Sequence, residues 1–119
     1  EEALQHLDWG FSRQLLALID ARGLTDAQVY RKAGLTRQHF SKIRSNPSYQ
    51  PRKQTVLALA FALELTLAET RDLLSSAGFA LNPSSIDDAI CAWYLERRMF
   101  DIDRVNQALY AYDRRLLGA

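Results

Sequence analysis

The sequence contains a single cysteine, five glycines, three prolines and two histidines in 119 residues. One cysteine cannot form a disulfide within the chain, and two histidines without a cysteine partner do not make a metal site. No apolar run approaches the length of a membrane span, and Glu1-Glu2 is acidic where a signal peptide would be basic. We therefore expect a cytoplasmic domain with its own hydrophobic core, no membrane contact, no metal and no cofactor.

The sequence also has little that would support catalysis. No Gly-rich phosphate loop is present, and no serine or cysteine has a histidine nearby in the sequence. The adjacent carboxylates Asp87-Asp88 and the pair Asp101 and Asp103 stand at expected helix starts, where capping explains them better than acid–base chemistry. Cys91 lies in a helical pattern and is interpreted as a small core residue. The expectation is no enzyme and no small-molecule substrate.

Acidic residues are missing from the middle of the chain. Residues 27–63 carry seven basic residues and no acidic one, although the net charge of the whole chain is only +1. Residues 1–26 have two basic and five acidic residues, and residues 64–119 have six basic and nine acidic ones. Basic residues on helices often form only a solvated face, but this polarity is also typical of proteins with an anionic partner.

The residues that start and stop helices predict an all-α domain of seven helices. Thr25 and Thr66 are each followed three residues later by Gln28 and Glu69, which is the pattern of a capping box. The expected N-caps are, in chain order, Asp8, Thr25, Thr36, Thr66, and Asp101 or Asp103. The expected stops are Gly23, Gly34 and Gly78.

Apolar side chains recur at helical spacing between these signals. The fourth helix, residues 53–63, is apolar on nearly every side and is expected at the centre of the bundle. The turn-rich residues 82–85 separate a domain, 11–81, from a C-terminal helical extension, 82–119, and residues 1–10 form a flank or linker. The extension is too short for a core of its own, so it must pack on the first five helices or on another chain. Its apolar residues at helical spacing are Ile86, Ala89, Ile90, Trp93, Tyr94 and Leu95, then Ile102, Val105, Leu109 and Tyr112. Trp93 and Tyr94 cannot both be buried on one narrow helix face, so part of this pattern could form an interface.

Residues 11–81 also combine these features in a specific order. The residues that carry this pattern are Thr25 as a cap, Val29 inward, Gly34 in the turn, Phe40 and Ile43 inward, and the apolar helix followed by ELTLAET. In this order and spacing the segment resembles the DNA-binding domain of Cro-type phage repressors, the XRE-like family. The resemblance implies a five-helix repressor-like helix-turn-helix bundle, here with two C-terminal helices packed on it. It also implies a bacterial transcriptional regulator, or the DNA-binding module of a larger bacterial protein, that binds double-stranded DNA as a homodimer or higher assembly.

The resemblance also implies which side chains would contact DNA. The third helix would enter the major groove, where arginine can form two bonds to guanine and glutamine two bonds to adenine. By position, the base-reading candidates are Arg37, Gln38, His39 and Lys42. The candidates for phosphate contacts are Arg44, Arg52 and Lys53, and Thr36 could cap the helix and touch a phosphate.

Two departures from the family pattern keep a second interpretation open. Asp26 takes a position that is often glutamine and would repel a phosphate, and Tyr30 takes a helix-crossing position that is usually small. Glu1 in place of methionine indicates a trimmed chain or a piece of a longer protein. The alternative is therefore a protein-interaction or self-assembly module with a repressor-like fold, appended to a larger defence or signalling protein. Its candidate interface residues are Trp93, Tyr94, Phe100 and Tyr110.

Overall fold

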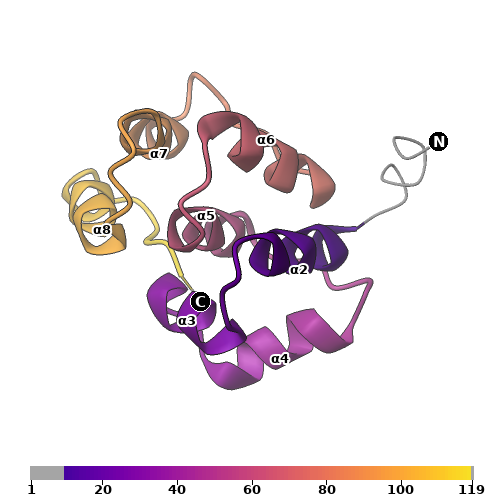
Figure 1. Ribbon diagram of the computed structural model, residues 1–119. Coiled ribbons are helices and arrows are strands. Elements are labelled where there is room, and N and C mark those ends of the chain that lie inside the picture. Colours follow the sequence, from indigo (N-terminus) through magenta and orange to yellow (C-terminus); the bar gives the residue numbers. More distant parts are fainter. Residues whose placement is uncertain (1–9, 119) are drawn as a thin grey trace.

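The computed structural model describes residues 10–118, and within them it contains only helices and their connections (Figure 1). The helices are α2 (Phe11–Ala21), α3 (Asp26–Ala33), α4 (Arg37–Ser45), α5 (Lys53–Ala62), α6 (Leu67–Ser76), α7 (Ile86–Glu96) and α8 (Ile102–Ala111). The all-α prediction is confirmed. None of these helices is long and apolar enough to cross a membrane.

Helix α5 lies at the centre of the fold, as the sequence predicted. Every residue from Thr55 to Ala62 is buried, and α3, α6 and α8 contact the helix. Figure 1 shows α5 in the middle, with α6 and α4 on opposite sides of it. A helix without a polar face can be stable only where other elements cover it on all sides. The other helices of the bundle supply that cover.

Local capping chemistry sets most of the helix ends. Thr25 and Thr66 form the two predicted capping boxes, and Thr36 accepts a hydrogen bond from the amide of His39. Gly34 ends α3 with a φ of 74°, in the left-handed region that favours glycine. The other predicted stops, Gly23 and Gly78, also have positive φ. The predicted cap of the last helix is confirmed as Asp101, which accepts from two amides.

The start of α2 differs from the prediction. Gly10 is the N-cap of α2, and it has no side chain with which to bond the first turn. Asp8, the predicted cap, lies outside the described residues. The sequence favoured Asp8 because glycine is a less common N-cap than aspartate. The predicted flank, residues 1–10, also lies outside the described residues except for Gly10.

The two helices of the extension pack on the bundle and on each other. Helix α7 contacts α6 and α8, and α8 also contacts α5. The inward stripe of α7 consists of Asp88, Cys91 and Leu95, with spacings of three and four residues. Burial raises the pKa of the Cys91 thiol to about 12, which agrees with its interpretation as a core residue.

Only part of the apolar pattern of the extension is buried. Ile86, Ala89 and Trp93 of α7 are exposed, and so is Tyr112 at the end of α8. The apolar pattern of α7 is wider than the narrow stripe through which the helix meets its neighbours. The outer part of that pattern therefore stays in solvent.

A buried ion pair joins α5 to α7. The ammonium of Lys53 donates to Oδ2 of Asp88 at 2.7 Å and to the carbonyl of Ala80 at 2.8 Å. The same Asp88 oxygen accepts from the amide of Asn82 at 2.6 Å. The predicted capping role of Asp88 is therefore wrong: Ser85 is the N-cap, and the Asp88 side chain points into the fold.

The segment that follows α8, residues 113–118, returns to the first half of the chain. The side-chain amide of Asn106 exchanges two hydrogen bonds with the backbone of Leu117, at 2.7 and 3.3 Å. The hydroxyl of Thr55 donates to the carbonyl of Gly118 at 3.1 Å. Gly118 lies so close to the end of α3 that an added Cβ would be 3.8 Å from the Gly34 carbonyl. The extension therefore ends against the α3–α4 turn.

Candidate nucleic-acid interface

Helices α3 and α4 form a compact pair with one apolar side and one polar side. Phe40 and Ile43 of α4 are buried, as is Val29 of α3. The side chains of Arg37, Gln38 and Lys42 on α4 are exposed. The buried apolar face of α4 packs on the rest of the bundle, and the opposite face leaves a row of polar side chains in solvent.

Tyr30 stays at the crossing of the two helices. Its ring is partly buried and packs on Phe40, with the ring centres 5.8 Å apart. The helices remain in contact despite its size. The tyrosine therefore extends the core outward at a position where the resemblance to Cro-type repressors implied a small residue.

Asp26 is paired with Arg44. The guanidinium donates from Nε to Oδ2 at 2.6 Å and from Nη2 to Oδ1 at 2.8 Å. Hydrogen bonding to the Asp26 carboxylate raises the pKa of Arg44. The pair links the first turn of α3 to the last turn of α4, so it neutralises the carboxylate and also occupies a candidate phosphate contact.

His39 joins α4 to the connection that follows it. Its Nε2 lies 2.9 Å from the hydroxyl of Tyr49, which belongs to the turn-rich segment before α5. Burial, and then the charges of Lys42 and Arg52, lower the pKa of His39, so the ring is neutral at pH 7. Tyr49 was not among the predicted site residues. Nothing in its local pattern indicates a histidine partner ten residues away.

Arg52 and Lys53 are neighbours in sequence but differ in their surroundings. The Lys53 ammonium donates hydrogen bonds to Asp88 and to the carbonyl of Ala80 inside the fold. Arg52 is the exposed N-cap residue of α5. Of the eight predicted DNA-contacting side chains, four are exposed and make no hydrogen bond or ion pair with any other residue of 10–118. These four are Arg37, Gln38, Lys42 and Arg52.

The four predicted interface aromatics differ in their exposure to solvent. Trp93 and Tyr110 are exposed to 45% and 78%. Tyr94 is half-buried with its edge against Trp93, and Phe100 packs edge-on against Phe61 of α5. Phe100 therefore belongs mainly to the contact between the extension and the bundle.

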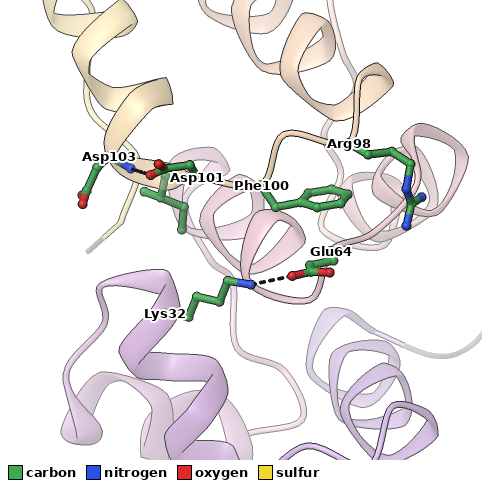
Figure 2. Close-up of a pocket in the computed structure, with 7 residues that line it drawn as sticks. Lys32, Glu64, Arg98, Phe100, Asp101 and Asp103 are labelled. Carbon is green, nitrogen blue, oxygen red and sulfur yellow. Dashed lines mark hydrogen bonds and ion pairs between the residues drawn. The ribbon is translucent and has the colours of Figure 1, made fainter.

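A polar hollow of about 680 Å³ lies between α3 and the start of α8. Figure 2 shows Lys32 of α3 reaching toward Glu64, with Phe100 and Arg98 nearby. The Lys32 ammonium lies 2.8 Å from the Glu64 carboxylate and lowers its pKa. Lys32, one of the seven basic residues of residues 27–63, is therefore paired with a carboxylate. The unpaired positive surface is smaller than the sequence indicates.

Comparison with known proteins agrees with this arrangement. The family model of the Cro/C1-type helix-turn-helix DNA-binding domain matches residues 14–71, which run from α2 into α6. No curated protein and no solved structure matches the chain. The predicted resemblance to Cro-type repressors is therefore confirmed for residues 14–71.

Proposed function

We propose that the chain binds duplex DNA sequence-specifically, with α4 in the major groove, as a transcriptional regulator or as the DNA-binding module of a larger protein. The observation that carries the proposal is the exposed row of Arg37, Gln38 and Lys42 on α4. An α-helix fits the major groove, where its first turns reach the base edges. The family match supports the same assignment.

The predicted DNA-contacting side chains differ in whether they are free to contact DNA or are already bonded within the fold. Arg37 and Gln38 begin α4 and are assigned to base edges, with Lys42 one turn further along. Arg52 is assigned to a backbone phosphate, which supplies affinity without sequence information. Lys53 is not assigned to a phosphate, because its ammonium already bonds to Asp88 and to the carbonyl of Ala80. Thr36 and His39 hold the start of α4 through their hydrogen bonds, and Arg44 becomes available only if it leaves Asp26.

The proposal is tested with the unmodified chain. Selection from a pool of random duplexes should enrich a common sequence. Fluorescence anisotropy should then show tighter binding to the enriched duplex than to a scrambled one, and the affinity for both should fall as the salt concentration rises. Enrichment of no sequence, together with no salt-dependent binding to any duplex at low ionic strength, would remove the proposal.

A second function is favoured by one observation, the exposure of Trp93, Tyr110 and Tyr112 on the extension. Large aromatic side chains are enriched at protein–protein contacts. If the selection fails and light scattering shows a mass that rises with protein concentration, the chain is an assembly module that retains the repressor fold.

The Asp26–Arg44 pair predicts a gain in DNA affinity on mutation. Asp26→Asn removes a negative charge from the first turn of α3 and frees the Arg44 guanidinium. We expect tighter binding to all duplexes at low salt, with a salt dependence steeper by about 0.9 in logarithmic slope, the value for one added phosphate contact. Anisotropy titrations in a salt series measure both effects. Asp72→Asn on α6 makes the same change in net charge and should alter the slope little. An unchanged slope for Asp26→Asn would show that Arg44 does not reach the DNA.

A further inference from the structure

We propose that the C-terminal extension contributes a residue to the DNA-binding surface: Arg115, which would bind a backbone phosphate together with Arg52. This inference rests on the proposed function and names a contact outside the matched domain, which ends at residue 71. It assigns residues 113–118 a role in binding as well as in packing.

The segment that carries Arg115 is held in place on both sides of this residue. Arg114 pairs with Asp87 of α7 at 3.4 Å. Two residues after Arg115, Leu117 is fixed by both atoms of the Asn106 amide, and Gly118 is bonded to Thr55 of α5. The backbone that carries Arg115 is therefore ordered before any ligand binds, which lowers the entropic cost of a contact.

Arg115 and Arg52 line the same open hollow. Both residues line a surface depression of about 830 Å³ at the start of α5, together with Gln50, Gln54 and Leu116. No carboxylate lines it among the described residues. Both arginines are exposed and make no ion pair within residues 10–118.

The carboxylates of α7 near this hollow are paired with cations other than Arg52 and Arg115. Asp87 and Asp88, which line an adjoining hollow together with Arg115, have cations of their own, because Asp87 pairs with Arg114 and Asp88 with Lys53. Arg52 and Arg115 therefore have no ion-pair partner among the described residues. Two guanidinium groups across one hollow repel each other, and a phosphate between them would turn that repulsion into two charge-assisted bonds.

The hollow borders the helix-turn-helix, which consists of α3 and α4. Arg52 is close enough to His39 of α4 for its charge to lower the pKa of that histidine. Gly118, three residues after Arg115, lies against the carbonyls of Ala33 and Gly34 in the turn that precedes α4. A duplex contacted by α4 would therefore pass beside the segment that carries Arg115. The phosphate it meets belongs to DNA next to the bases that α4 reads.

The test uses the full chain and the duplex enriched by selection, extended by random flanks. Arg115→Gln should make the salt dependence of binding shallower by about 0.9 in logarithmic slope, by the same amount for enriched and scrambled duplexes. Arg115→Lys should restore most of the slope. Arg71→Gln, an exposed arginine on α6, is the matched control and should leave the slope unchanged. Thermal melts should agree for all three variants because the side chains are exposed.

The outcomes separate this inference from the proposed function. If Arg52→Gln lowers the slope but Arg115→Gln does not, the domain binds DNA without the extension and the inference is wrong. If the unmodified chain binds no duplex, the proposed function and the inference fail together. If Arg115→Gln lowers the slope and Arg115→Lys recovers it, the extension is part of the DNA-binding surface.

Discussion

Replacing Asp88 with alanine is expected to lower the free energy of unfolding by about 3 kcal/mol. Asp88 is almost fully buried, and its loss leaves the Lys53 ammonium inside the fold without a counter-ion. Breaking a buried pair by removing one partner costs roughly 3–5 kcal/mol in general. The lower value applies here because the Lys53 side chain keeps 26% of its surface exposed. The amide of Asn82 also loses its acceptor. Thermal melting should show a decrease in Tm on the order of 10 °C.

Two variants control for this effect. Asp87→Ala removes the neighbouring carboxylate on the same helix, whose pair with Arg114 is exposed, so it should cost less than about 1 kcal/mol. The double variant Lys53→Met, Asp88→Leu leaves no buried charge alone and should be more stable than Asp88→Ala. If Asp88→Ala and Asp87→Ala melt at the same temperature, the pair does not hold the extension to the bundle.

Replacing Arg37 with alanine is expected to reduce discrimination between base pairs by about 1–3 kcal/mol at one position of the DNA site. Arg37 is the first residue of α4 and has an exposed side chain. A guanidinium at this place can form two hydrogen bonds to a guanine, which alanine cannot replace. Competition between the enriched duplex and variants with single base changes measures the effect. The variant should accept all four base pairs at that position with similar affinity.

Arg104→Ala on α8 is the control for Arg37→Ala. It removes an equal charge from an exposed position in the extension and should leave the preference among bases unchanged. If Arg37→Ala weakens binding equally to every duplex, Arg37 contacts a phosphate and base recognition rests on Gln38 and Lys42.

The sequence predicted those features of the fold that depend on neighbours within about four residues. The capping boxes at Thr25 and Thr66 and the left-handed end at Gly34 are local, and all three are confirmed. The burial of α5 followed from its composition alone. The same reasoning failed for Asp88 of α7, which was expected to cap the helix and is buried instead. The partner of Asp88 is Lys53, a residue 35 positions earlier, so no local pattern indicates that this carboxylate faces inward.

The candidate site was less predictable because pairing over long distances decides which charges are free. Arg44 and Lys53 look like any other surface cations in the sequence. Their partners, Asp26 and Asp88, lie 18 and 35 residues away and become visible only in the fold. The role that we propose for Arg115 has no local signal in the sequence, because it depends on a C-terminal segment that places Arg115 at the same hollow as Arg52. The domain division at residues 82–85 remains a prediction, as do the roles of the exposed side chains.

The burial of α5 on every side also separates rigid from adjustable parts of the molecule. Its amide hydrogens can exchange with solvent only when the whole domain opens, so they should be the slowest to exchange. Helix α4 has only two buried residues, Phe40 and Ile43, and one face in solvent. Its amides can exchange through local openings that leave α5 intact. The fit of α4 to a bound partner can therefore be adjusted without loosening the core that supports it.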